Sequence, residues 1–192
     1  TKAIKEYSEK DEFPESSKEF KTLHYKQNNI HDFAWFADKR FHVLASEVTL
    51  PESKRVVKTY VMYSNKYAEY WKDASKYIND AVYYYSLWNG DYPYNFCTAI
   101  DGALSAGGGM EYPMITVIGE VGSGKTLDEV ITHEVGHNWF YGIIGSNERE
   151  HPWMDEGVNS FYEQRYMRMK YGDGHMLPAS ARNPFTYFFG LD

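Results

Sequence analysis

A pair of histidines with a glutamate beside the first of them is the residue pattern with the clearest chemistry. His133 and His137 are four positions apart, and Glu134 follows His133 directly. On a helix, residues four apart lie one turn apart on the same face, so both imidazoles can reach one cation. Glu134 projects toward the same side, where it can take a proton from a metal-bound water. This H-E-x-x-H pattern predicts a metal-dependent hydrolase.

A third ligand is predicted further along the chain. Eighteen residues separate His137 from Glu156, which lies at the start of the next predicted helix. A catalytic zinc site uses three protein ligands and keeps a fourth position open. Two imidazoles and one carboxylate suit Zn²⁺ best, although Co²⁺ or Mn²⁺ could occupy the same ligands. We therefore predict one Zn²⁺ ion per chain, bound by His133, His137 and Glu156, with Glu134 as the catalytic base.

Two further residues near this pattern are candidates for supporting roles. Glu163 lies seven residues after Glu156, two turns along the same face. It could contact a ligand histidine without binding the metal itself. A solvated or structural glutamate is the competing interpretation of this position. His151 lies in the segment that leads to Glu156, and an exposed or structural role is expected for it.

Two helices are needed to position these side chains, and the sequence predicts both. Residues 126–141 carry the histidines, and residues 153–171 carry Glu156 and Glu163. An earlier helix, ending before Gly90, is predicted by apolar and aromatic side chains at three- and four-residue spacing, which are expected to pack against a sheet. This stripe comprises Tyr67, Tyr70, Trp71, Ala74, Tyr77, Ile78, Ala81, Tyr85 and Trp88.

Strand-like segments lie on both sides of that earlier helix. Residues 33–36, 41–44 and 55–61 are rich in β-branched and aromatic side chains. After the helix, residues 95–100 and 110–118 are apolar and flank a glycine-rich segment.

The composition is that of a globular protein. Of the 192 residues, 43% are apolar and 18% aromatic, which is enough for one substantial core or two small ones. The formal net charge of −7, with both signs interspersed, argues against nucleic acid as the main partner. No apolar run reaches membrane-spanning length, so a soluble surface is predicted. The sequence does not identify the compartment, and the periplasm, the extracellular space and the cytoplasm all stay open for the parent enzyme. Cys97 is the single cysteine, so no intrachain disulfide can form.

A second motif competes for the histidine-bearing helix. Residues 119–126 satisfy the G-x-x-x-x-G-K-[S/T] pattern of a nucleotide-binding P-loop, between a predicted strand and a predicted helix. Lys125 would then contact phosphates and Thr126 would bind Mg²⁺. No apolar strand ending in Asp follows to supply a second magnesium ligand. The alternative interpretation is a glycine-rich turn in which Thr126 is the N-cap and Glu129 completes a capping box.

Three blocks of the sequence resemble the M1 metallopeptidases, the gluzincin aminopeptidases. The first is similar to that family's G-x-M-E-N signature, the second extends the H-E-x-x-H motif, and the third surrounds Glu156. They occur in the family's order and spacing, and weaker similarity runs from about residue 20 to residue 172. The blocks are Gly108-Gly109-Met110-Glu111-Tyr112-Pro113, His133 to His137 followed by Asn138-Trp139-Phe140, and Trp153-Met154-Asp155-Glu156-Gly157.

The resemblance implies an α+β fold, with a thermolysin-like catalytic domain made of a mixed sheet and of helices that carry H-E-x-x-H and the third-ligand glutamate. Residues 1–50 would form a lead-in and the end of a β-rich N-terminal domain, and residues 51–192 the zinc peptidase domain. The implied activity is that of an aminopeptidase on peptides with a free N-terminus. By the family pattern, the substrate-binding residues would lie on the edge strand of the sheet, and Glu111 would bind the free α-amine of the substrate. These substrate-binding residues are Gly108, Gly109, Met110 and Glu111.

Three departures from the family pattern accompany the resemblance. Tyr112 stands where the signature has Asn, which leaves the charge of Glu111 intact. The family's transition-state tyrosine has no counterpart in a matching context, and its C-terminal helical domain is missing. We therefore expect the chain to be a piece of a longer enzyme that is weakly active alone, or a catalytically silent zinc-binding module. The tyrosines considered for that role are Tyr162, Tyr166, Tyr171 and Tyr187.

Overall fold

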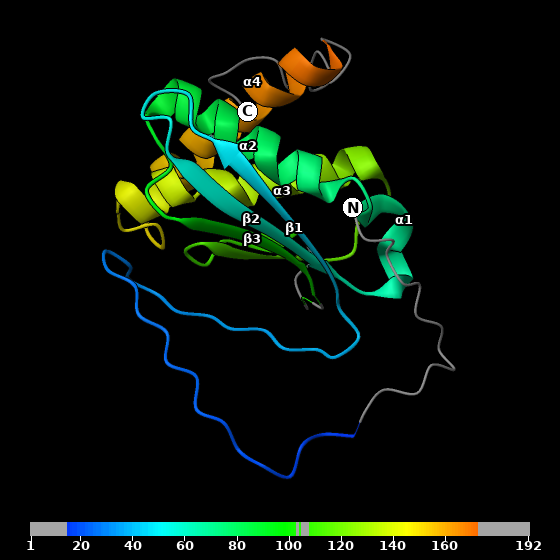
Figure 1. Cartoon of the computed structure of the whole chain (residues 1–192). Helices are drawn as coiled ribbons and strands as arrows, with labels where there is room; N and C mark the ends of the chain where they lie inside the picture. The colour runs from blue at the N-terminus through cyan, green and yellow to red at the C-terminus, as the bar shows by residue number, and fades with distance from the viewer. Residues whose placement is uncertain (1–14, 103, 105–107, 173–192) are drawn as a thin grey trace.

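A mixed five-stranded sheet supports the residues singled out above. The computed structural model describes residues 15–102, 104 and 108–172 (Figure 1). The strand order is β1-β2-β3-β5-β4, in which β2, β3 and β5 run parallel, whereas β1 and β4 are antiparallel to their neighbours. The strands are β1 (His42–Thr49), β2 (Val56–Tyr63), β3 (Phe96–Asp101), β4 (Gly109–Met110) and β5 (Ile115–Ile118).

The main helices lie on one face of this sheet (Figure 1). Helix α2 packs against β1, β2 and α3, and α3 packs in turn against β5 and α4. None of the helices in the described ranges has the length and apolar character needed to cross a bilayer. The helical elements are η1 (Asn65–Tyr67), α1 (Ala68–Trp71), α2 (Ala74–Asn89), α3 (Gly124–Gly136), η2 (Asn138–Ile143), η3 (Trp153–Val158) and α4 (Asn159–Tyr171).

The aromatic stripe of the first long helix forms the centre of the core, as predicted. Five of its residues are fully buried: Trp71, Ala74, Ile78, Ala81 and Tyr85. The helix is interrupted, however, because α1 ends at Trp71 and α2 begins at Ala74. This stripe faces α3 as well as the sheet, which fixes the helix that carries His133 and His137 against the core.

The α+β class with a mixed sheet is confirmed, but two local predictions were wrong. Residues 33–36 form no strand, and Phe33 and Trp35 are exposed. Aromatic residues favour a strand only where a partner strand covers them, and none in the described residues does so here. The apolar stretch 110–118 is also divided, because Met114, with φ of 65°, lies in a turn between β4 and β5.

The boundary between two domains at residue 50 stays a prediction. Strand β1 precedes this boundary and pairs with β2 over eight consecutive positions, from His42 opposite Tyr63 to Thr49 opposite Val56. The chain after residue 172, including His175 and Tyr187, lies outside the described residues.

Candidate metal centre

Helix α3 carries His133 and has His137 as its C-cap, and its N-cap lies three residues earlier than predicted. Ser123 is the N-cap, and its Oγ accepts a hydrogen bond from the backbone N–H of Thr126 at 3.1 Å. The prediction that Thr126 is the N-cap and that Glu129 completes a capping box was therefore wrong. Ser123 has the extended backbone of a cap residue, and the rule that Ser and Thr are both good caps does not distinguish the two.

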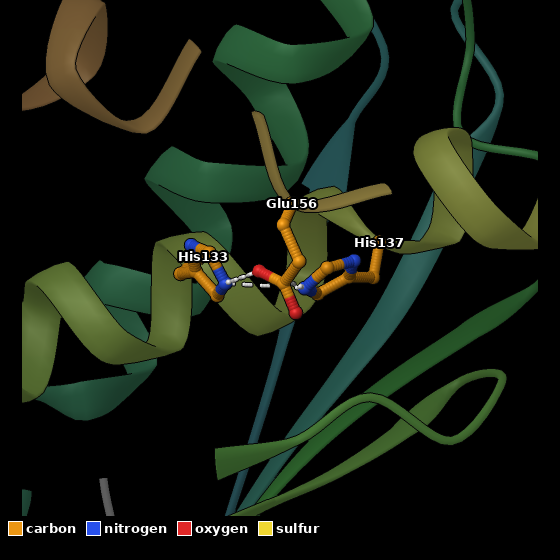
Figure 2. A group of neighbouring side chains, drawn as sticks. All are labelled: His133, His137 and Glu156. Atoms are coloured by element: carbon orange, nitrogen blue, oxygen red, sulfur yellow. Dashed lines mark hydrogen bonds and ion pairs between the residues drawn. The ribbon is translucent and has the colours of Figure 1, made fainter. Parts of the chain in front are cut away.

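Three candidate ligand atoms meet at one point. The Nε2 atoms of His133 and His137 are 3.1 Å apart, and Oε2 of Glu156 lies 3.2 Å from the first and 3.9 Å from the second. Figure 2 shows the carboxylate of Glu156 between the two imidazole rings. Ligands at zinc–nitrogen distances of about 2.05 Å in a tetrahedron lie about 3.3 Å from one another. The three separations therefore fit one zinc-sized ion without a large rearrangement.

The other nitrogen of each imidazole contacts a carboxylate. Nδ1 of His133 lies 2.9 Å from Oε2 of Glu163, and Nδ1 of His137 lies 2.7 Å from Oδ1 of Asp155. Metal-binding histidines usually donate their second ring N–H to such a carboxylate, which directs the Nε2 lone pair toward the ion. The contact of Glu163 was expected from the sequence. That of Asp155 was missed, and the only signal for it was an acidic residue directly before Glu156.

The electrostatics of this cluster favour a cation. Burial opposes protonation of His133, yet hydrogen bonds to Glu156 and Glu163 outweigh it and raise the pKa of its imidazole to about 10. Burial likewise opposes protonation of His137, but the hydrogen bond to Asp155 raises the pKa of that imidazole. The hydrogen bond from His133 lowers the pKa of Glu156. Three carboxylates thus surround two imidazoles, and a divalent cation fits the charge and the donor atoms of this set.

Glu134 lies beside the candidate ligands in a buried position. Burial raises the pKa of its carboxyl group to about 7. Its carboxyl contacts the backbone of β4, since a Cβ atom added to Gly109 would lie 2.3 Å from Oε1 of Glu134. Glu111, which follows β4 directly, has ligand-type oxygen atoms within 4.8 Å of those of Glu134 and of a nitrogen of His137. Burial also raises the pKa of Glu111.

The predicted substrate-binding residues lie along the edge of the sheet. Strand β4 is the last strand in the order and pairs with β5 alone among the described residues, with Met110 opposite Val117. Gly108, with φ of 70°, accepts a hydrogen bond on its carbonyl from the N–H of Gly119 at 2.7 Å. The hydroxyl of Thr116 donates to the carbonyl of Met110 at 3.0 Å. Within the described residues, β4 is therefore held by β5 on one side and pairs with no strand on the other.

The sequence of this chain is similar to those of curated aminopeptidases over about a third of its length. Leucine aminopeptidase 2 of Neurospora crassa is 34% identical over 71 residues, and its namesake from Phaeosphaeria nodorum is 31% identical over 70 residues. Leukotriene A-4 hydrolase of Xenopus laevis is 31% identical over 68 residues. Each match covers 34–35% of this chain and 11% of the relative. No family model matches the chain.

The fold is that of solved M1 structures. An M1 zinc metallopeptidase from Deinococcus radiodurans, solved as a mutant, superposes with a TM-score of 0.51 at 15% identity, over 70% of this chain and 30% of that one. Aminopeptidase A of Legionella pneumophila gives 0.59 at 14% identity, over 69% of this chain and 17% of that one. The chain resembles M1 metallopeptidases in fold and curated aminopeptidases in part of its sequence. The matched part of the chain spans 11% of the length of those curated relatives, and the superposed part covers 30% and 17% of the two solved chains.

The P-loop-like segment, residues 119–126, has contacts that give nucleotide binding no support. The hydroxyl of Thr126 lies 2.9 Å from Oγ of Ser123, so it takes part in the helix cap. The ammonium group of Lys125 lies over the ring of Tyr171, 5.3 Å from its centroid. Glu120 pairs with Lys66 at 2.6 Å. The segment therefore serves as the turn that leads into α3.

The remaining candidates from the sequence do not belong to the groups of candidate metal ligands in the described residues. His151 is exposed in the segment before η3, as expected. Tyr166 and Tyr171 both donate their hydroxyl groups to Asp128, and the ring of Tyr162 stacks on that of Phe140. The ring of Tyr112, the departure from the M1 signature, lies 6.5 Å from that of Phe36.

Proposed function

We propose that this chain supplies the zinc site and the substrate-binding strand of an aminopeptidase that releases N-terminal residues from peptides. One observation carries the proposal. Two imidazole nitrogens and one carboxylate oxygen lie 3.1, 3.2 and 3.9 Å from one another, and the Nδ1 atom of each imidazole contacts a further carboxylate. The relatives' names and the M1 fold support the same activity.

In this proposal His133, His137 and Glu156 hold one zinc ion. Glu163 and Asp155 keep the proton of each imidazole on Nδ1, so that both Nε2 lone pairs face the ion. Two neutral ligands and one carboxylate leave the bound ion with net positive charge. When bound, the zinc polarises the scissile carbonyl and makes water acidic enough to be deprotonated near neutral pH.

Glu134 is the proposed general base. Its carboxyl group lies one residue from His133 on the same helix and contacts β4, along which the substrate would bind. In that position Glu134 accepts a proton from the attacking water and returns it to the leaving amine. The contact with Gly109 keeps the carboxyl group between the candidate ligands and the substrate's backbone.

Glu111 is the proposed recognition site for the free α-amine. An extended peptide that adds to the edge of β4 would present its backbone to Met110 and its N-terminus to Glu111. A carboxylate that is partly buried binds an ammonium group more strongly than one in water, because the local dielectric constant is lower. This contact would select chain termini over internal peptide bonds.

Metal binding is tested first, without any need for activity. The expected result is one zinc ion per chain by elemental analysis, with tight binding lost in His133→Ala. His151→Ala is the matched control, because His151 is exposed and outside the ligand group, and it should retain the ion. A chain that binds magnesium–ATP tightly and loses it on Lys125→Ala would instead support the nucleotide-binding alternative.

Catalysis is tested with aminoacyl anilides. Hydrolysis of a free aminoacyl anilide, absence of hydrolysis of its N-acetylated form, and loss on Glu134→Gln are expected. Glu111→Gln should raise KM and lower kcat/KM, since the amine contact is weakened in both ground and transition states. Zinc binding without any hydrolysis would identify the chain as a silent metal-binding module.

A further inference from the structure

A buried charged cluster joins α3 to α4 at a distance from the metal ligands. Asp128 of α3 is fully buried, and three groups from α4 contact its carboxylate. The hydroxyl of Tyr166 lies 2.8 Å from Oδ1, and the hydroxyl of Tyr171 lies 2.6 Å from Oδ2. The ammonium group of Lys170 lies 2.5 Å from Oδ2. Every carboxylate oxygen of Asp128 is thus bound by α4.

The same lysine connects the cluster to α2. Nζ of Lys170 lies 2.9 Å from Oδ2 of Asp80 and 4.9 Å from the centroid of the Tyr77 ring. A buried carboxylate is costly unless a cation and hydrogen-bond donors compensate it, so removal of one partner is strongly unfavourable. The cluster therefore resists any sliding of α4 along α3 or α2.

Helices α3 and α4 are joined a second time at the metal site. Glu163 lies three residues before Tyr166 on α4, and His133 lies five residues after Asp128 on α3. The side-chain amide of Asn159 also donates to the carbonyl of His133 at 2.8 Å. Glu163 precedes Tyr166 along α4, whereas His133 follows Asp128 along α3, as expected for two antiparallel helices. One position of α4 along α3 therefore satisfies both the buried cluster and the Glu163–His133 contact.

We propose that Asp128, acting through Lys170 and Tyr166, is a positioning residue for the metal site. The cluster sets the register of α4, which brings the carboxylate of Glu163 to Nδ1 of His133. Because α4 continues directly from η3, the same register also places Glu156. The effect of Asp128 on zinc affinity rests on the proposed function. Its effect on the orientation of the His133 ring does not.

Asp128→Asn tests this inference through two measurements. In the metal-free protein, ¹⁵N NMR of the ring nitrogens should show His133 protonated and hydrogen-bonded at Nδ1 in the wild type, and should show that signature lost in the variant. In competition with a chelator, the variant should bind zinc about tenfold more weakly, which is the lower end of the effect of losing a partner of a metal-binding histidine. Tyr166→Phe keeps the Asp128–Lys170 pair and should fold normally, with zinc binding about threefold weaker.

Val57→Ala is the matched control for general destabilisation, because Val57 is buried in β2 and makes no part of the cluster. It should lower the free energy of unfolding and leave the His133 signature and zinc affinity unchanged. The inference is overturned when Asp128→Asn and Tyr166→Phe match this control in both measurements. A wild type that binds no zinc while Asp128→Asn still changes the His133 signature would remove the proposed function and leave the positioning role standing.

Discussion

The backbone of Gly109 lies directly against the carboxyl group of Glu134. A Cβ atom added to Gly109 would lie 2.3 Å from Oε1 and 2.4 Å from Cδ of Glu134, distances that real Cβ atoms do not show. Gly109 belongs to β4 and Glu134 to α3, so the edge strand and the histidine-bearing helix meet at this contact. Glycine is required here by close approach, and the contact aligns the proposed base with the proposed substrate-binding strand.

Gly109→Ala should therefore separate catalysis from metal binding. The new methyl group displaces the carboxyl of Glu134, and a displacement of about 1 Å at a catalytic group can cost about 100-fold in rate. We expect aminoacyl-anilide hydrolysis to fall by about that factor. Zinc affinity should stay within about twofold, since the three atoms nearest to the new methyl group all belong to Glu134 and none to a candidate ligand.

Gly122→Ala is the control for this substitution, because a Cβ atom at Gly122 would meet no atom within 4 Å. It should leave both hydrolysis and zinc binding unchanged. Equal activity in the Gly109→Ala variant and the wild type would show that the contact with Glu134 has no catalytic role.

Gly136→Ala should destabilise the fold although alanine favours helices. A Cβ atom at Gly136 would lie 2.0 Å from Oδ1 of Asn159 and 2.4 Å from Cε1 of Tyr85. Overpacking of this kind costs about 1–3 kcal/mol or more, whereas the gain in helix propensity is about 1 kcal/mol. We expect a net loss in the free energy of unfolding, measured with urea. The loss should be smaller when Asn159→Ala is already present; an unchanged loss would mean that the clash with Asn159 is not its cause.

The helical part of the site could be predicted because its pattern is local. The spacing of His133 and His137 places them on one face of a helix, and the buried stripe of α2 is visible as a three- and four-residue period. Glu156 could be added because it lies in a block with a resemblance to a known family. The first two inferences use residues that are close in sequence. The third uses the order of motifs along the chain and needs no knowledge of how distant segments pack.

The contacts that depend on the packing of distant segments could not be predicted. Nothing in the local sequence distinguishes Asp155 from Glu156. The backbone of η3 directs Asp155 to Nδ1 of His137 and Glu156 to the Nε2 atoms of His133 and His137. Asn159 lies inside the helix predicted over residues 153–171, and nothing local indicates that its side chain donates to the carbonyl of His133 on another helix. The aromatic content of residues 33–36 predicts a strand, whereas strand formation also requires a partner.

The thiol of Cys97 should be unreactive in the folded chain. Cys97 lies in β3 with 1% of its surface exposed, and burial raises the pKa of its thiol to about 12. The thiolate is the reactive form, so labelling by a disulfide reagent at pH 8 should be at least about 100-fold slower in the native chain than in urea. The raised pKa also predicts stability that is complete below the unfolded thiol's pKa and decreases as pH rises toward 12. Equal labelling rates in the native and unfolded chains would contradict the burial of this residue.

Asp155→Ala should weaken zinc binding by about 10- to 100-fold, because the buried imidazole of His137 loses the carboxylate 2.7 Å from its Nδ1. The ring is then free to adopt the other tautomer, in which Nε2 carries the proton and cannot bind the ion. The buried Nδ1–H is then left with the more distant carbonyl of Phe140 at 3.4 Å, and this weaker hydrogen bond should lower the free energy of unfolding by about 1 kcal/mol. Chelator competition measures the first effect and urea unfolding the second. Glu150→Ala, which removes an exposed carboxylate from the same stretch of chain, is the matched control and should change neither quantity. If Asp155→Ala lowers stability but binds zinc as tightly as Glu150→Ala, then Asp155 supports the fold alone and the orientation of His137 has another cause.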